Sequence, residues 1–253
     1  MTQAQAKPYL RGKPADSGTL RAAAAVFGGL LLMSFLNLIL TGSASVMKAD
    51  WLRIGFCAAQ ALVYYALFFY RGQERGTAGV THGETMYNRR SSGKPVSPED
   101  EARCYHPAKG FLEALLGSLP ALILAAVYAF MTQKQRMTPG ALPTWVANNT
   151  SRQDVVDPLV AYTVQESAAL VDYLRVVVRT LLMPYVTIVG SSNTDAILTL
   201  ERLGPALTLL PAIAYGVGYC FGPRSRARVQ EDIAEGKRRL ARKQRREKRQ
   251  RRA

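Results

Sequence analysis

The sequence predicts an all-α integral membrane protein with four transmembrane helices, an additional outer amphipathic or re-entrant helix and a basic cytoplasmic tail. First, apolar and charged residues are segregated into alternating stretches, although the averages of 48% hydrophobic and 20% charged residues resemble a soluble domain. A soluble domain would intersperse the two kinds at helical or strand period. Second, several apolar runs approach the roughly 20 residues that a helix needs to cross a bilayer core. Third, Lys and Arg gather in a few segments, as topology signals do.

A polar, basic segment, residues 1–18, opens the chain and is expected in the cytoplasm. The first predicted span is 19–40, a short turn covers 42–50, and the second span is 51–70. Trp51 and Tyr70 stand at the ends of the second span, where aromatic residues favour the membrane interface. A cleaved secretory signal is the rival interpretation of the first span. Its apolar run is longer than the roughly 7–15 residues of a signal core, so we expect an uncleaved anchor.

A polar segment, residues 71–110, is predicted to be a cytoplasmic loop because Gly, Pro and charged residues interrupt any folding pattern. The third span is predicted at 111–131 and the fourth at 204–221, which closes a membrane domain of residues 19–221. Residues 132–203 between them form the outer region, and 222–253 form the tail. Pro120 and Pro211 are expected to kink their helices. Glu113 and Glu201 lie near span ends, where we expect pairing or snorkelling.

The Lys and Arg counts predict which side of the membrane each segment occupies. The amino-terminal segment with Arg21, the 71–110 loop and the tail together hold 25 of these residues, whereas the turn 42–50 and the outer loop 132–156 hold 4. Cytoplasmic segments carry the excess of positive charge in membrane proteins. The sequence therefore predicts a multi-pass protein of the cell membrane with both termini in the cytoplasm.

Residues 174–189 form an apolar segment that could be taken for a fifth span. Two cytoplasmic ends require an even number of crossings, and 16 residues are few for a full crossing. We therefore expect a helix that lies on the outer surface or dips in and returns. It would begin at Asp157-Pro158, a favourable start, and end or kink at Pro184. Polar residues form one narrow stripe on this helix. The helix either lies on the membrane surface or covers the bundle, or its stripe lines a water-filled path, and the path residues would be Asp172, Arg175 and Arg179.

Small residues recur every four positions in the third and fourth spans. This spacing puts them on one face of a helix, and such faces let helix backbones approach closely in lipid. The predicted helix-packing residues are Gly117, Ala121, Ala125, Ala129, Ala214, Gly218 and Gly222. The partner helix could belong to this chain, to a second copy or to another membrane protein.

The tail holds fourteen Lys or Arg residues against four acidic ones, so it carries +10 of the chain's net charge of +15. It could serve only to set topology as a solvated helix, lie on the anionic inner leaflet, or bind RNA through phosphates. We do not expect a nucleic-acid partner, because the tail lacks the aromatic residues on which bases stack. The residues assigned to anionic-lipid or partner binding are Arg245, Arg246, Lys248, Arg249, Arg251 and Arg252.

No catalytic motif, cofactor or metal site is predicted. Three cysteines at 57, 104 and 220 do not form a disulfide framework. A weak candidate for a metal site is the set His82, Glu84, Cys104 and His106, whose spacing departs from that of zinc sites. The leading hypothesis is a non-enzymatic accessory or scaffold subunit that acts through helix packing, with a membrane-protein partner or a homo-oligomer. The alternative is a small transporter or channel subunit.

Overall fold

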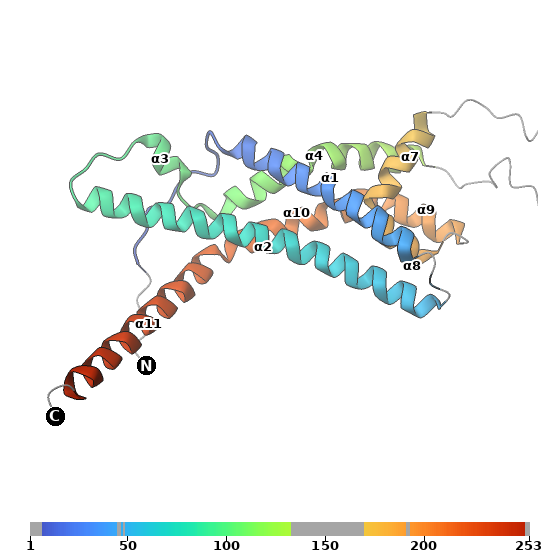
Figure 1. Ribbon diagram of the computed structural model, residues 1–253. Helices are drawn as coiled ribbons and strands as arrows, with labels where there is room; N and C mark the ends of the chain where they lie inside the picture. The colour runs from blue at the N-terminus through green and yellow to red at the C-terminus, as the bar shows by residue number, and fades with distance from the viewer. Residues whose placement is uncertain (1–6, 45–46, 48, 133–169, 191–192, 251–253) are drawn as a thin grey trace, which may run out of the picture. The chain divides into compact units, whose positions relative to one another are not determined.

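The computed structural model describes residues 7–44, 47, 49–132, 170–190 and 193–250, and all secondary structure in these ranges is helical. Three helices are long and apolar enough to cross a membrane, and a bent pair near the carboxyl end makes a fourth if it counts as one span. Figure 1 shows the helices along the chain. The predicted all-α class is therefore confirmed for the described residues. The expected turn 42–50 and the outer loop up to residue 169 lie wholly or partly outside them, including the predicted helix start at Asp157-Pro158.

Helix α1 (Thr19–Ala44) follows a turn that is held by Asp16. One carboxylate oxygen of Asp16 accepts hydrogen bonds from the backbone N–H of Gly18 at 2.9 Å and from the hydroxyl of Thr19 at 3.0 Å. Such a side chain satisfies groups that have no partner within the first helical turn. The helix contains the first predicted span, residues 19–40.

Helix α2 (Asp50–Ser91) is 42 residues long and corrects the predicted loop. Its first half is the expected apolar span, but the helix continues without a break through residues 71–91 (Figure 1). It ends where Gly93 adopts a positive φ of 74°, a conformation that glycine tolerates and that stops a helix. The polar half has four glycines, which weaken an isolated helix, so its stability depends on the packing described below.

Short helix α3 (Pro98–Arg103) and long helix α4 (Pro107–Met131) follow. Ser97 caps α3, and Pro98 occupies its first position, where proline is well tolerated. Helix α4 contains the third predicted span and carries Pro120 in its interior.

The carboxyl-terminal half contains α7 (Leu170–Leu181), α8 (Met183–Val189), α9 (Thr194–Arg202), α10 (Gly204–Cys220) and α11 (Gly222–Gln250). Helix α7 ends just before α8, whose first turn holds Pro184, so the predicted break at this proline is confirmed. Helices α9 and α10 form the bent pair, with an angle of 51° between them. Helix α10 coincides with the fourth predicted span.

The chain divides into two compact units. The first comprises Met1–Leu31, Leu62–Leu119 and Leu209–Ala253, and the second comprises Leu32–Ala61 and Pro120–Thr208. In the first unit Tyr105 and Tyr219 stack with ring centroids 5.3 Å apart and bury Val80 beside them. In the second unit Tyr128, Val178 and Leu182 form the buried cluster.

Asn37 of α1 and Gln60 of α2 form a buried pair of amides in the second unit. The Gln60 side-chain nitrogen donates to the Asn37 side-chain oxygen at 2.8 Å and to the Asn37 carbonyl at 3.2 Å. Both positions lie within apolar runs where a polar side chain needs a partner. Hydrogen bonds of this kind join transmembrane helices in lipid.

Candidate functional site

The polar half of α2 is the framework of the first unit, and its glycines are where other backbones touch it. A methyl group on Gly72 would collide with the Tyr215 carbonyl, and one on Gly76 would collide with the Tyr219 carbonyl. A methyl group on Gly83 would lie only 2.7 Å from the Leu10 carbonyl oxygen. Glycine is required at these positions because any side chain would separate the segments.

Helices α10 and α11 contribute small residues of their own to this contact. A methyl group on Gly218 would collide with the Phe69 backbone, and one on Gly222 would collide with the Gly76 backbone. A methyl group on Gly117 of α4 would lie only 2.6 Å from the Ala23 carbonyl oxygen of α1. Three of the seven predicted packing residues thus contact other helices of the same chain.

The other four predicted packing residues vary in burial. Ala121 and Ala125 are buried, with 4% and 0% of their surface exposed. Ala129 and Ala214 are partly buried. The closest approaches involve glycine, and those in the polar half of α2 were not predicted because that segment was interpreted as a loop.

A buried ion pair fixes the amino-terminal segment to α4. The ammonium of Lys109 donates to the Asp16 carboxylate at 2.6 Å and to the Ala102 carbonyl at 3.0 Å. Both side chains of the pair are only 3% exposed. Burial opposes ionisation of Asp16, but the hydrogen bond and charge of Lys109, with help from Thr19 and Gly18, hold its pKa below the ordinary value.

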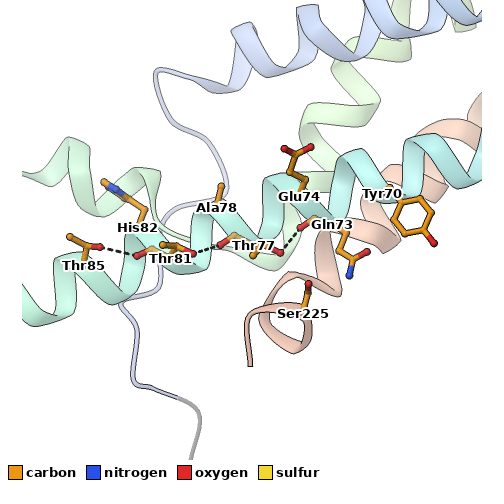
Figure 2. A pocket seen from close by; sticks show the side chains of 9 residues that line it. All are labelled: Tyr70, Gln73, Glu74, Thr77, Ala78, Thr81, His82, Thr85 and Ser225. Carbon is orange, nitrogen blue, oxygen red and sulfur yellow. Dashed lines mark hydrogen bonds between the residues drawn. The ribbon is translucent and has the colours of Figure 1, made fainter. Parts of the chain in front are cut away.

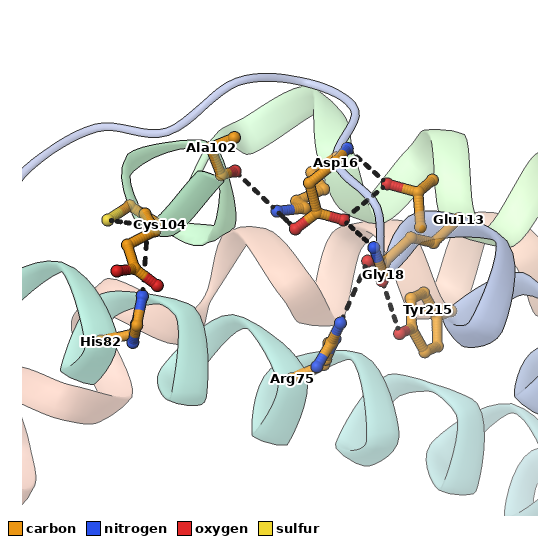
Figure 3. Close-up of polar contacts among 11 residues, drawn as sticks. Asp16, Gly18, Arg75, His82, Ala102, Cys104, Glu113 and Tyr215 are labelled. Carbon is orange, nitrogen blue, oxygen red and sulfur yellow. Dashed lines mark hydrogen bonds and ion pairs between the residues drawn. The ribbon is translucent and has the colours of Figure 1, made fainter. Parts of the chain in front are cut away.

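A second acidic group, Glu113 of α4, is fully buried beside the first. Figure 3 shows Arg75 and Tyr215 converging on it from α2 and α10. The Tyr215 hydroxyl donates to one carboxylate oxygen at 3.1 Å, and the Arg75 guanidinium lies 3.6 Å from the other. The pairing expected for Glu113 is therefore present, and it joins three helices of this unit.

A third ion pair holds the start of α11 against α2. Arg226 donates two hydrogen bonds from one nitrogen and a third from another to the Glu84 carboxylate, the shortest at 2.9 Å. Gln230, one turn further on, donates to the same carboxylate. Glu84 is buried with 7% of its surface exposed, so its charge needs these donors.

The candidate metal ligands have other partners in the structure. Glu84 is bound by Arg226 and Gln230, and the His82 ring nitrogen Nε2 lies 3.2 Å from the Asp100 carbonyl. The Cys104 thiol donates to that same carbonyl, and the His106 ring accepts from the Ala108 N–H. Among the described residues no three His, Cys, Asp or Glu side chains are grouped to hold a metal ion. Burial raises the pKa of the Cys104 thiol, which makes it a poor nucleophile.

No family model, curated protein or solved structure matches this chain. The candidate site is therefore assigned from its geometry alone.

An open groove of about 880 Å³ runs along the polar half of α2 to the first turn of α11 (Figure 2). Three threonines that line it, Thr77, Thr81 and Thr85, each donate to the carbonyl four residues earlier, at 2.8 to 3.0 Å, so their hydroxyl groups are engaged within α2. The residues that line the groove are Tyr70, Gln73, Glu74, Thr77, Ala78, Thr81, His82, Thr85 and Ser225. An open groove buries little of the surface of a small molecule. Its shape suits an extended segment or a helix better.

The predicted polar stripe lies in the second unit, where the structure surrounds it with partners. Arg179 donates to the Glu201 carboxylate at 2.7 Å, and Thr132 donates to the other oxygen of Glu201 at 2.5 Å. Arg175 donates to the Tyr128 hydroxyl at 3.0 Å and to Asp172 at 2.7 Å. The stripe therefore forms a network between α4, α7 and α9, and Glu201 is the acidic member that completes it.

The basic residues assigned to lipid or partner binding stand at the end of α11. The structure describes the helical backbone at Arg245, Arg246, Lys248 and Arg249. Arg251 and Arg252 lie outside the described residues.

Proposed function

We propose that this chain is a polytopic integral membrane protein that acts as a non-enzymatic accessory or scaffold subunit. The membrane part of the proposal is supported by the exposure of its apolar helices. In the most apolar windows of α1, α2 and α4 only 28%, 17% and 33% of the residues are buried inside the molecule. Exposed apolar surface on this scale is unfavourable in water and favourable in lipid.

The scaffold part is supported by the groove on α2, which is the single observation that carries it. The groove is built on helices held by close glycine contacts and by the buried acids Glu84 and Glu113. Such a framework loses little conformational freedom when a partner binds, and preorganisation of this kind favours association. We assign the groove to a helical or extended segment of a partner polypeptide, either a membrane protein or a second copy of this chain.

Disruption of the groove tests this assignment. The protein is purified in mild detergent as wild type, as Ala78→Arg in the groove, and as Asn88→Arg on the exposed end of the same helix. We expect a partner in fixed stoichiometry with the wild type and Asn88→Arg proteins, and its loss from Ala78→Arg. A wild-type protein that purifies as a lone monomer, or a partner retained equally by all three proteins, would contradict the proposal.

A small transporter or channel subunit is the second candidate function. It is favoured by the network of Arg175, Arg179 and Glu201, because charged groups kept inside a membrane domain mark ion or substrate paths in many transporters. Flux of ions or small solutes through proteoliposomes would test it. We expect Arg179→Gln together with Glu201→Gln to change that flux if the path exists, and unchanged flux in a folded double variant would exclude it.

A further inference from the structure

One face of helix α11 takes part neither in the groove on α2 nor in the ion pairs described above. It is a single unbroken helix of 29 residues (Figure 1), about 43 Å long at 1.5 Å per residue. Its first two turns are fixed to α2 by Gly222, Arg226 and Gln230. Beyond Gln230, within the described residues, the contact that the structure shows is an exposed pair of Glu235 with Arg239, one turn apart at 3.4 Å.

Three large apolar side chains share one side of α11. Val229, Ile233 and Leu240 follow one another at spacings of four and seven, and 41%, 51% and 62% of their surfaces are exposed. Residues at these spacings lie on the same face of a helix. We call Val229, Ile233 and Leu240 the apolar stripe of α11.

Basic and acidic residues are distributed unequally around the apolar stripe of α11. The helical period places Lys237 and Lys243 at its two edges, where long side chains can reach outward with their ammonium groups. The same period places Glu231 and Glu235 on the far side and Asp232 near the edge that holds Lys243. A helix with an apolar strip and a lysine at each edge of it has the pattern of one that lies in the surface plane of a membrane.

The position of α11 along the chain also favours a membrane surface as its binding partner. Only Phe221 separates it from α10, a candidate membrane helix. If α10 crosses the bilayer, α11 starts at the bilayer surface and its basic residues are within reach of lipid headgroups. The guanidinium of Arg224 lies 5.3 Å from the centre of the Phe221 ring, which places an aromatic and a cation together at this boundary.

We propose that α11 binds the anionic cytoplasmic leaflet of the membrane through its apolar stripe and the Lys and Arg residues beside it. The proposal rests on the insertion of the chain in the membrane, as stated under the proposed function. Anionic lipid complements the net positive charge of the helix. RNA would complement the charge too, but α11 has no aromatic residue for base stacking, and RNA would leave the apolar stripe without a role.

A fluorescent probe on α11 of the full-length protein tests the proposal. A cysteine at Gly236 puts the probe beside the apolar stripe without removing an apolar residue, and a methyl group there would meet nothing within 4 Å. The helical period places Ala234 on roughly the opposite face, so Ala234→Cys is the matched control. Cys57, Cys104 and Cys220 are replaced by serine, and each protein is reconstituted in vesicles of phosphatidylcholine with or without phosphatidylserine.

We expect the Gly236→Cys probe to shift to shorter wavelength and to lose most of its quenching by aqueous iodide only when phosphatidylserine is present. The Ala234→Cys probe should remain quenched, and high salt should reverse the Gly236→Cys shift because salt screens exposed charges. Replacement of Lys237 and Lys243, the two basic residues at the edges of the stripe, by glutamine should reduce the shift. Equal quenching at both positions in phosphatidylserine vesicles would overturn the proposal, as would a shift at both positions produced by added RNA and not by lipid.

Failure of this proposal is distinguishable from failure of the proposed membrane insertion. Flotation of the vesicles after alkaline carbonate washing reports insertion independently of α11. A protein that floats while its Gly236→Cys probe stays quenched contradicts lipid binding by α11 alone. A protein that is washed off contradicts the membrane assignment and, with it, the present proposal.

Discussion

At the residue scale, a buried ion pair determines how two distant segments of the first unit meet. Asp16 and Lys109 come from segments 93 residues apart in the sequence, and both side chains are almost fully enclosed. A charge in such surroundings is costly unless its partner is present. The pair therefore specifies where the amino-terminal segment meets α4.

Removal of one member of this pair is predicted to destabilise the protein strongly. Lys109→Met leaves the Asp16 carboxylate buried without its partner, and we expect a loss of about 3–5 kcal/mol in the free energy of unfolding. Denaturant unfolding in detergent measures it. The double variant Asp16→Asn with Lys109→Met should lose less than Lys109→Met alone, because no unpaired charge remains.

The exposed pair of Glu235 with Arg239 is the control. Its side chains are 66% and 82% exposed, and Glu235→Ala should leave unfolding nearly unchanged because exposed pairs contribute little. Equal effects of Lys109→Met and Glu235→Ala would show that the buried pair has no special weight.

Asp16 also predicts a pH dependence of stability. Its pKa is lower in the folded protein than the unfolded value of 3.8, so folding favours the ionised form. The resulting stabilisation is complete at pH values well above 3.8 and is lost as the pH falls through the folded pKa. We expect the difference in melting temperature between wild type and Asp16→Asn to be constant near neutral pH and to shrink below about pH 4. A difference that grows on acidification would contradict this sign.

Helix α2 shows, at the scale of elements, what the sequence could and could not predict. Apolar runs of about the length of a membrane span predicted the helices α1, α4 and α10 and the first half of α2. A run of that length and composition rarely forms anything other than a buried or membrane helix. Pro184 predicted a helix break because its ring cannot fit a helix interior. Glu113 and Glu201 were expected to pair, but their partners Arg75 and Arg179 could not be named from the sequence.

Residues 71–91 were predicted as a loop because glycine and charge are poor signs of a helix. The contacts of Gly72, Gly76 and Gly83 with other backbones offset the weak intrinsic preference of these residues. Their spacing, with Gly79 between them, is four, three and four residues, which is a helical pattern and was the available signal. Which helices meet this face depends on tertiary packing and could not be inferred from a single segment.

Alanine at Gly76 is predicted to disrupt this packing. Its methyl group would overlap the Tyr219 carbonyl, a backbone atom that cannot move without shifting α10. We expect Gly76→Ala to lower the free energy of unfolding by about 1–3 kcal/mol, as overpacking does. Circular dichroism during thermal unfolding in detergent measures the loss.

Gly55, earlier in the same helix, is the matched control. A methyl group there would meet nothing within 4 Å, so Gly55→Ala should be neutral or stabilise the helix by up to about 1 kcal/mol. If the two variants melted alike, the close approach at Gly76 would carry no energetic weight.

Segregation of charge along the chain is the property that concerns the whole molecule. Segments rich in Lys and Arg alternate with apolar helices, and we propose from the positive-inside rule that the amino terminus, residues 71–110 and α11 lie on one side. This assignment requires an even number of crossings, so it is consistent only if α7 and α8 do not form an additional span. The two helices are separated at Leu182, and α8 has 7 residues, fewer than the roughly 20 residues of a crossing helix.

Cysteine labelling in whole cells is predicted to show an even number of crossings. Single cysteines at Lys48 and Ala141 stand in the expected outer segments, and single cysteines at Lys94 and Gln250 stand in the expected cytoplasmic ones; the native cysteines are replaced by serine. A membrane-impermeant maleimide should label positions 48 and 141 in intact cells and positions 94 and 250 only after permeabilisation. The physical reason is that the fourteen basic residues of the tail resist transfer across the membrane. If α7 and α8 together crossed the bilayer as a fifth span, Gln250→Cys would be labelled from outside while Lys94→Cys would not, and that pattern would reverse the side on which α11 meets lipid.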